Sequence, residues 1–229
     1  MKKGILAGAL IALTMSLNAF AEANKEKRDI DEFSKIEASK GVNVSLIQNN
    51  EKREIEVVTE GCPTADVETT IKKDVLYVKM KKRTAGSAVQ VFVYFKDIDE
   101  VKLKGGASVD TECLFAHEGK FTLDLAADCE AEMDVEVDEL EVLGNTCMIT
   151  MSGKAKKQTV DIAGTLGNSK YDAEALESDE CDIIATTAEA VVNVKDKLNA
   201  QSAGGIIRYK GTAEVTKKET FEGKIVELE

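Results

Sequence analysis

The segment "LNAQSAGGIIRYKG", Leu198 to Gly211, separates two interpretations of the whole chain. Its apolar residues alternate with polar ones, and a glycine pair interrupts the alternation before Arg208 and Lys210. Glycines beside basic side chains occur in loops that bind phosphate, and they occur equally at the corners of repetitive β structures. The first interpretation predicts an enzyme and the second predicts a scaffold. The remainder of the sequence decides between them.

Apolar residues recur with a period of two along much of the chain. Strict alternation directs one set of side chains inward and the other into water, as in a half-buried strand. The pattern predicts strands over residues 42–48, 54–59, 75–81 and 89–95, and over the segment "MDVEVDELEVL" at residues 133–143. After residue 21, the one helical candidate is a short charged piece near Lys25 to Glu32, for which disorder is the favoured interpretation. The predicted fold class is all-β.

The second half of the chain repeats a unit of strand, small-residue corner and second strand. The units start at Val101, Phe121, Leu140, Val160, Cys181 and Leu198, at intervals of about 20 residues. This period fits a β-solenoid, because a single coil cannot bury its apolar face without a stacked neighbour. A meandering β-sandwich also has short strands at such spacing, and periodicity alone does not separate parallel coils from hairpins. We favour the solenoid because corners and strands stay in phase across six units.

Small residues recur at the predicted corners. Glycine permits tight bends and positive φ angles that are costly for larger side chains. The corner glycines are Gly105, Gly106, Gly144, Gly164, Gly204, Gly205 and Gly211. The pair in the opening segment therefore matches other corners that offer nothing to a phosphate, and we interpret it as the last bend of the stack.

The N-terminus has the layout of a secretory signal peptide over residues 1–21. Lys2 and Lys3 precede an apolar run from Ile5 to Leu17, and Ala19 and Ala21 form an A-x-A site that predicts cleavage after Ala21. The run is too short for a stop-transfer helix, and no second run in the mature chain is long enough to span a membrane. We therefore expect an exported protein that is periplasmic, at the cell surface or secreted.

The mature chain divides into four predicted regions. Residues 22–32 form a disordered lead-in, and residues 33–100 form an N-terminal β region that is continuous with the solenoid. Residues 101–216 form the repeated coils, and residues 217–229 form a C-terminal strand or tail.

The charge of the mature chain is strongly negative. The sequence has 30 basic and 42 acidic residues, and loss of Lys2 and Lys3 leaves a net charge of about −14. Such a surface repels phosphate backbones and anionic lipid headgroups. The composition thus argues against nucleic acid and membrane partners.

Five cysteines remain after the predicted cleavage: Cys62, Cys113, Cys129, Cys147 and Cys181. Their spacing matches no zinc pattern, and an odd number leaves at least one thiol free. Cys129 and Cys147 occupy nearly equivalent places in consecutive coils, where strands lie about 4.8 Å apart, so a disulfide between them is geometrically feasible. Two buried thiols are an equally good interpretation, because inward small positions favour cysteine.

The sequence contains no catalytic constellation. His117, the sole histidine, lies in the polar segment "FAHEGK" and is interpreted as a solvated loop residue. Asp134, Glu136 and Asp138 share one strand face, and three outward acids are most often simply solvated. Lys154, Lys156 and Lys157, like the basic segment "KMKKRTAG" at residues 79–86, read as the charged end of a strand entering a turn. No cofactor or metal site is predicted.

Three segments carry a resemblance to a known family. They are "FSKIEASKGVNVSLIQ" at Phe33–Gln48, "VQVFVYFKDIDEVKLKGGASV" at Val89–Val109 and "VVNVKDKLNAQSAGGIIRYKG" at Val191–Gly211. In their order and spacing, with the small-residue corners between them, they resemble the head GIN domain family of putative auto-transporter adhesins. The resemblance covers about Asp29 to Thr216 and departs from the usual Ser/Gly corner pairs at residues 127–129 and 145–147.

This resemblance implies a right-handed parallel β-helix at the cell surface or in the periplasm, and it brings no catalytic residues. We therefore expect an exported, non-enzymatic β-solenoid that binds a glycan or protein ligand at the cell envelope. The alternative is a carbohydrate-active enzyme, a polysaccharide lyase or hydrolase, that uses acids along one solenoid face. A third interpretation is a structural protein without a discrete ligand.

Overall fold

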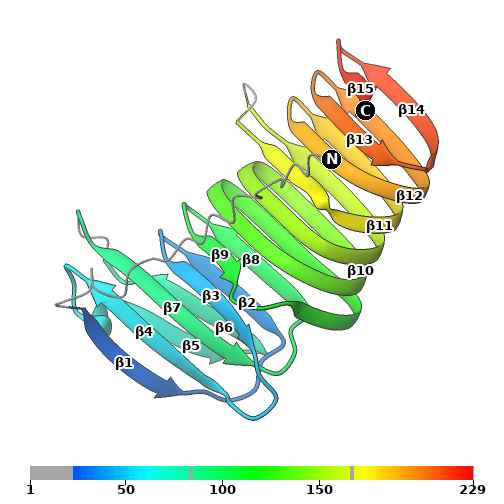
Figure 1. Ribbon diagram of the computed structural model, residues 1–229. Helices are drawn as coiled ribbons and strands as arrows, with labels where there is room; N and C mark the ends of the chain where they lie inside the picture. The colour runs from blue at the N-terminus through cyan, green and yellow to red at the C-terminus, as the bar shows by residue number, and fades with distance from the viewer. Residues whose placement is uncertain (1–22, 83–84, 166–167, 229) are drawn as a thin grey trace, which may run out of the picture.

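The computed structural model describes residues 23–82, 85–165 and 168–228, and within these ranges the regular elements are strands and one short 3₁₀ helix. The strands are β1 (Asn24–Asp29), β2 (Lys35–Ser39), β3 (Asn43–Gln48), β4 (Glu54–Glu60), β5 (Val67–Lys72), β6 (Val75–Met80), β7 (Ala88–Phe95), β8 (Glu100–Lys104), β9 (Ser108–Thr111), β10 (Phe115–Ala163), β11 (Lys170–Thr186), β12 (Glu189–Ala203), β13 (Ile206–Gly211), β14 (Glu214–Thr220) and β15 (Lys224–Glu227), and the 3₁₀ helix is η1 (Thr64–Asp66). All strands join one curled, mixed sheet of 15 strands (Figure 1). The predicted all-β class is confirmed.

Alternation of apolar and polar residues accounts for the strands. The four strands predicted in the first half correspond to β3, β4, β6 and β7, and each agrees within a residue at both ends. In β7, Val89, Val91 and Val93 are buried, whereas the residues between them are partly exposed. The inward side chains of all coils form one continuous core cluster.

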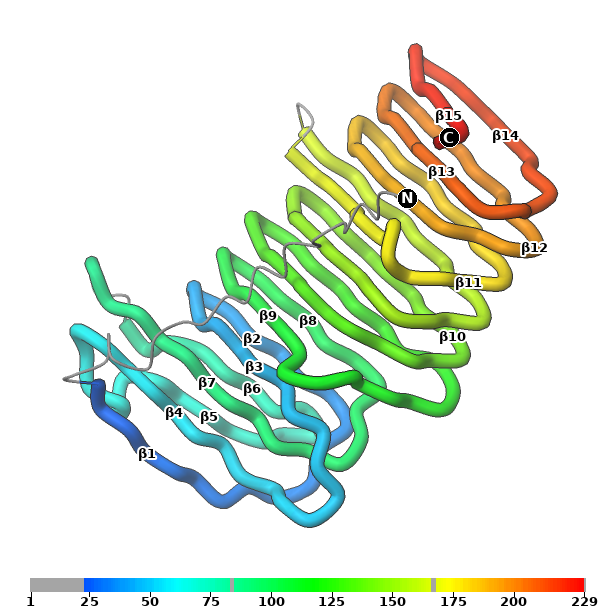
Figure 2. The backbone as a smooth tube through the Cα atoms, viewed as in Figure 1, coloured from blue at the N-terminus to red at the C-terminus, as the bar shows by residue number. Residues whose placement is uncertain are grey.

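From β8 to β15 the strands pair in parallel. Glu100 pairs with Thr122, Met148 with Lys170, Lys170 with Glu189, and Glu189 with Ile206. The partners are thus separated by about one predicted repeat, and successive turns of the chain lie side by side along the stack (Figure 2). A meandering sandwich, which needs antiparallel hairpins, does not describe this half of the chain.

The N-terminal region belongs to the same sheet but is not wound in chain order. Strands β2 and β3 pair in parallel with β8 and β9 on one side and with β6 and β7 on the other. The first coil therefore lies inside the stack, and the chain then passes outward to form the end. There β4 pairs antiparallel with β7 and β1, and β5 pairs antiparallel with β6.

Residue 22 lies outside the described residues, and residues 23–32 differ from the expected disordered lead-in. Residues Asn24–Asp29 form β1, which pairs along its whole length with β4. The charged composition concealed this strand, because its inward positions are Glu26 and Arg28, which lie opposite the buried residues Val57 and Ile55. The predicted signal peptide over residues 1–21 lies outside the described residues.

The C-terminal boundary also differs from the expectation. Residue 216 falls inside β14, and both β14 and β15 continue the parallel pairing, with β12 and β13 respectively. Residues 214–220 and 224–227 therefore continue the stack as strands, which is one of the two forms expected for residues 217–229. Among the described residues, no helix is long and apolar enough to cross a membrane.

Positive φ angles recur at the corners. Gly105 and Gly106 have φ of 62° and 72°, and Gly204 has φ of 68°. Ala127 and Asp128, where the sequence departs from the Ser/Gly corner pairs, adopt the same left-handed conformation with φ of 62° and 60°. The bend is therefore kept without glycine, at a steric cost of about 1 kcal/mol per residue.

At three other corner glycines, neighbouring backbone or side-chain atoms occupy the space that a Cβ would need. A Cβ on Gly205 would lie 2.4 Å from the carbonyl oxygen of Ala188, and one on Gly164 would lie 2.8 Å from the Cβ of Ser169. A Cβ on Gly144, inside β10, would lie 2.9 Å from Cys147 Sγ. These three positions lack space for a side chain.

Cys129 and Cys147 are both buried free thiols, as are Cys62 and Cys181, whereas Cys113 is exposed. The Cys129 thiol donates to the carbonyl oxygen of Ala126 at 3.0 Å, and Cys147 Sγ lies 3.7 Å from Ser169 Oγ. Of the two interpretations, the structure contains the thiols and not the bridge. Burial raises the pKa of both cysteines, which disfavours the thiolate that disulfide exchange requires.

Candidate functional site

Three adjoining hollows form one groove along a side of the stack. Their volumes are about 280, 790 and 550 Å³. The first and second share Lys96 and Asp97, and the second and third share Asp138, Lys156 and Asp179. The groove therefore runs from the N-terminal strands across β10 and β11 to β12.

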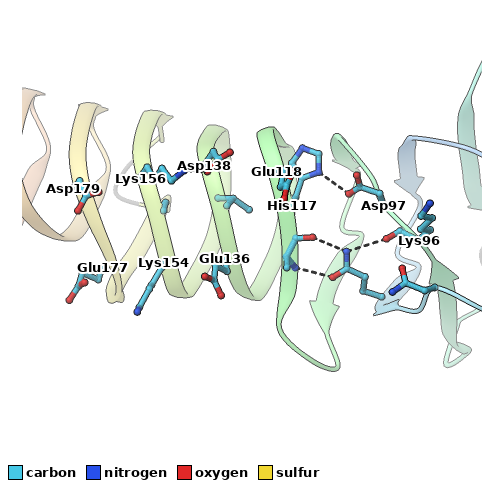
Figure 3. A pocket seen from close by; sticks show the side chains of 15 residues that line it. Lys96, Asp97, His117, Glu118, Glu136, Asp138, Lys154, Lys156, Glu177 and Asp179 are labelled. Carbon is cyan, nitrogen blue, oxygen red and sulfur yellow. Dashed lines mark hydrogen bonds and ion pairs between the residues drawn. The ribbon is translucent and has the colours of Figure 1, made fainter.

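Period-two alternation places the charged side chains on this groove. In β10, Glu136 and Asp138 point outward on either side of the buried Val137. Lys154 and Lys156 flank Ala155 in the same way, and Figure 3 shows the two pairs side by side on neighbouring turns. In the central hollow, the apolar residues Val137 and Ala155 thus lie between outward charges.

The sign of the charge alternates from coil to coil. Glu177 and Asp179 on β11 follow the lysines of β10, because Lys154 pairs with Glu177 in the parallel register. We refer to the bands of residues 136–139, 154–157, 177–180 and 195–197 as the charge bands. Their charged members are Glu136, Asp138 and Glu139; Lys154, Lys156 and Lys157; Glu177, Asp179 and Glu180; and Lys195, Asp196 and Lys197. Neighbouring bands lie about 4.8 Å apart, close enough for ion pairs.

Ion pairs between bands engage part of these side chains. Lys156 Nζ lies 2.5 Å from Asp138 Oδ1, and Lys195 Nζ lies 3.7 Å from Asp179 Oδ1. The hydrogen bond from the Lys156 ammonium lowers the pKa of Asp138, and the hydrogen bond from the Gly119 N–H adds a smaller effect in the same direction. The hydrogen bond between Lys156 and Asp138 also raises the pKa of Lys156. Both groups are therefore held in their charged forms.

A row of three groove residues is exposed and outside this pairing. Glu136, Lys154 and Glu177 lie on three consecutive bands, and none of them is within 4.0 Å of an oppositely charged group among the described residues. Exposed charges that are free of an internal partner can bind a ligand without first breaking a contact. This row is the part of the groove best suited to recognition.

His117 is not the solvated loop residue that the sequence suggested. It lies in β10 with a side chain only 5% exposed, and its Nδ1 is 2.8 Å from Asp97 Oδ1. Its ring stacks on Phe115 at 6.1 Å between centroids. The polar composition of "FAHEGK" suggested a loop, but β10 already starts at Phe115. The carboxylate that binds His117 comes from Asp97, in the loop before β8.

The acids predicted to be solvated separate into two environments. Asp134, Glu136 and Asp138 all point outward, but Asp134 lies outside the groove, where it accepts a hydrogen bond from Ser152 Oγ at 3.1 Å. Asp138 is bound to Lys156 rather than only to solvent.

The sequence placed three lysines at the charged end of a strand, and this interpretation was wrong, because Lys154, Lys156 and Lys157 lie inside β10. The Lys157 ammonium lies 3.4 Å from the Asp182 carboxylate. Part of the similar segment at residues 79–86, namely residues 83–84, lies outside the described residues. One sequence signal could have predicted the charge bands: acidic and basic triplets alternate at intervals of about one repeat. Within the ranges that the structure describes, no cluster of three or more His, Cys, Asp or Glu side chains could hold a metal ion.

Comparison with known proteins gives one family and several similar folds. The family model described as "Putative auto-transporter adhesin, head GIN domain" matches residues 32–213. No curated protein matches the chain.

Three solved structures share its architecture. A putative adhesin from Bacteroides fragilis is 16% identical, with a TM-score of 0.76, over 91% of this chain and 98% of that one. A putative lipid binding protein from Parabacteroides distasonis is 14% identical, with a TM-score of 0.68 and coverages of 92% and 98%. A putative adhesin from Parabacteroides merdae is 20% identical, with a TM-score of 0.63 and the same coverages. At these identities the similarity establishes the fold.

Proposed function

The chain belongs to the family of putative auto-transporter adhesins with a head GIN domain, and from this premise we propose that it is an exported, non-enzymatic protein that binds an extended ligand along its groove. The observation that carries the proposal is the continuity of the groove, whose adjoining hollows share charged residues from the N-terminal strands to β12. An elongated site of this kind suits a polymer better than a compact metabolite.

The ligand in this proposal is a glycan or an extended protein segment at the cell envelope. Glu136, Lys154 and Glu177 supply an acceptor, a donor and an acceptor on consecutive bands about 4.8 Å apart. Charge-assisted hydrogen bonds from such a row are stronger than neutral ones. A ligand with basic or hydroxyl groups opposite the acids and acidic or carbonyl groups opposite the lysine satisfies all three.

The ion pair between Asp138 and Lys156 in the groove suits binding by fixed charges better than proton transfer. A glycosidase or lyase site needs a carboxyl or basic group that exchanges protons near neutral pH. In the groove the pKa of Asp138 is lowered and that of Lys156 is raised, so both resist proton exchange. Asp110, whose pKa burial raises, lies on β9 outside the groove.

For the fold we propose a right-handed parallel β-helix. The support is the run of parallel pairs between segments one repeat apart, because connections between parallel strands of one sheet are right-handed in about 98% of cases. For the location we propose export, with cleavage after Ala21, to the cell surface or periplasm. N-terminal sequencing of the protein from the cell envelope tests this, and a mature chain that starts at Glu22 is the expected result.

A binding screen with matched variants tests the function. The mature chain is incubated with panels of glycans and of host-matrix proteins, and both retained ligand and reaction products are measured. The groove variant Glu136→Gln/Lys154→Gln/Glu177→Gln removes the unpaired row without breaking an ion pair. The control variant Glu130→Gln/Glu132→Gln/Lys25→Gln removes the same charges from exposed positions outside the groove.

We expect saturable binding without turnover, a loss of at least about tenfold in affinity for the groove variant, which corresponds to about 1.4 kcal/mol, and no change for the control. Shortened or unsaturated sugars among the products would overturn the non-enzymatic assignment. Equal binding by both variants would exclude the groove as the site.

A further inference from the structure

The stack has two ends, and each end exposes the edge of a sheet. Strands β1 and β5 lie at the edges of one end, and β14 and β15 lie at the other (Figure 1). Unpaired backbone groups on an edge strand are a template for another chain. For a stack of parallel coils the best-fitting addition is a second copy, because its terminal coil has the same strand spacing and repeat.

The C-terminal end places two charged side chains at inward positions. Strand β14 pairs with β12 so that Lys217 lies opposite Ala200 and Glu219 opposite Ser202, both of which point into the core. Lys217 Nζ lies 4.7 Å from the centre of the Tyr209 ring and donates to the carbonyl oxygen of Ile225 at 3.4 Å.

Glu219 occupies the next inward position of β14 and also contacts β15. Its carboxylate accepts the Ile225 N–H at 2.6 Å. The apolar core therefore ends in an ammonium and a carboxylate that both remain exposed. In the three preceding coils, the positions that the register aligns with these two are apolar or small and uncharged: Ala200 and Ser202, Ile183 and Ala185, and Val160 and Ile162.

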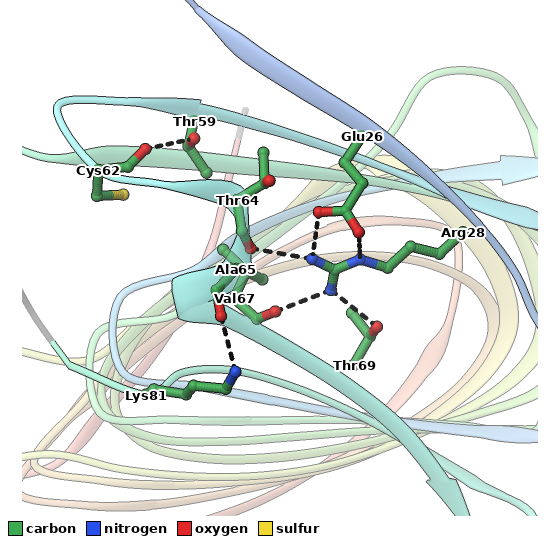
Figure 4. Close-up of polar contacts among 9 residues, drawn as sticks. All are labelled: Glu26, Arg28, Thr59, Cys62, Thr64, Ala65, Val67, Thr69 and Lys81. Carbon is green, nitrogen blue, oxygen red and sulfur yellow. Dashed lines mark hydrogen bonds and ion pairs between the residues drawn. The ribbon is translucent and has the colours of Figure 1, made fainter.

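The N-terminal end has the same pair of charges at inward positions. Glu26 lies opposite Val57 and Arg28 opposite Ile55 in the pairing of β1 with β4. The Arg28 guanidinium donates to both carboxylate oxygens of Glu26 and to the carbonyl oxygens of Thr64 and Val67 at 2.9 and 2.8 Å (Figure 4).

We propose that these inward charges keep a second copy of the chain from stacking on either end. At the C-terminal end, a copy that extended the sheet would bury the Lys217 ammonium and the Glu219 carboxylate, which now face water. At the N-terminal end it would cover the Glu26 carboxylate, whose side chain is 42% exposed, together with the remaining exposed part of Arg28. Desolvation of such charges costs several kcal/mol per ion. The backbone edge is therefore exposed to solvent, but a second copy cannot pair with it without burying these charges. This is the device by which edge strands avoid association, applied at both ends of a repeat stack.

The geometry predicts what happens when one end is neutralised. Two C-terminal ends can meet only through a two-fold axis, and that contact closes after two copies. Neutralisation of the C-terminal end alone should therefore give a dimer and not a fibre.

The test compares two double variants of the mature chain by sedimentation velocity over a range of concentrations. Lys217→Met/Glu219→Gln keeps the aliphatic stem over Tyr209 and the acceptor for Ile225 but removes both charges. Glu214→Gln/Lys218→Met makes the same chemical changes at outward positions of the same strand.

We expect the inward variant to reach twice the mass of the wild type as concentration rises, and the outward variant to keep the wild-type mass. If the inward variant folds, as judged by circular dichroism, and keeps the wild-type mass at all concentrations, the proposal is wrong. If it does not fold, Lys217→Gln/Glu219→Gln, which also neutralises both inward charges, serves as the same test. The readout is independent of ligand binding in the groove.

Discussion

Both ends of the stack have charged residues at inward positions of an edge strand, but the two ends differ in strand arrangement. At the N-terminal end the edge strands are antiparallel, and Arg28, with 17% of its side chain exposed, links β1 to η1 and β5. At the C-terminal end the coils stay parallel, and the side chains of Lys217 and Glu219 interact with Tyr209 and Ile225. One end depends on its charged residue for stability, whereas the other uses charge mainly to remain unpaired.

The largest loss of stability is expected from a substitution that displaces the C-terminal coil. A Cβ on Gly211 would lie 2.0 Å from the carbonyl oxygen of Val194, and the residue has φ of 113°. Gly211→Ala should therefore destabilise the protein by about 3 to 5 kcal/mol in urea unfolding, through overpacking and backbone strain together. Hydrogen exchange should quicken in β13, β14 and β15 and stay slow in β1 and β4.

The matched control is Gly106→Ala. Gly106 has φ of 72°, but the space around its missing Cβ is open. We expect a cost of about 1 kcal/mol from conformation alone. Equal losses for the two variants would mean that close approach of the coils is not what requires Gly211.

The next largest effect should come from the N-terminal end. Arg28→Met removes the donors to Thr64, Val67 and Thr69 and should cost about 2 kcal/mol in urea unfolding, with faster hydrogen exchange in β1. Lys217→Met, at the exposed C-terminal end, should change stability by less than about 0.5 kcal/mol. Similar costs for the two substitutions would remove the distinction between the ends.

Acid should weaken the N-terminal end through protonation of Glu26. The hydrogen bond to Arg28 lowers the pKa of Glu26 from 4.5 to about 2. Because the folded-state pKa lies below the unfolded one, Glu26 stabilises the fold above pH 4.5, and this contribution is lost as the pH falls toward 2. Thermal unfolding of Glu26→Gln should thus show a smaller loss of Tm between pH 6 and pH 3 than the wild type, and identical losses would contradict the assignment.

The smallest effect concerns the corners between the two ends. Ala127 has φ of 62°, a conformation that glycine adopts without steric cost. Ala127→Gly should stabilise the protein by about 0.5 kcal/mol, because relief of the left-handed strain exceeds the added entropy of the unfolded chain. A lower midpoint of thermal unfolding for this variant would show that the alanine methyl contributes contacts that outweigh the strain.

The sequence predicts the strands and most corners because their physics is local. Alternation determines which side chains face the core, and small residues mark the bends. It does not predict that β2 and β3 lie inside the stack, because an apolar pattern specifies a face and not a partner strand. The buried Gln158 is equally unreadable, since its partners Tyr171 and Ser178 come from the next coil.

The groove could be predicted only in part. The outward positions of Glu136 and Asp138 follow from alternation, but their opposition to Lys154 and Lys156 depends on the register between coils. Strand β1 and His117 were misread for one reason: polar residues at inward or buried positions are satisfied by partners distant in sequence, Val67 for Arg28 and Asp97 for His117.

The claim that inward charges close both ends is tested most directly by neutralising them together. The measurement is sedimentation velocity of the variant Glu26→Gln/Arg28→Gln/Lys217→Met/Glu219→Gln against the variant changed at the C-terminal end alone. With both ends open, head-to-tail contacts no longer close, so the mass should increase with concentration well beyond that of a dimer. A folded quadruple variant that stops at the dimer would contradict the claim for the N-terminal end, and one that keeps the wild-type mass would contradict it for both.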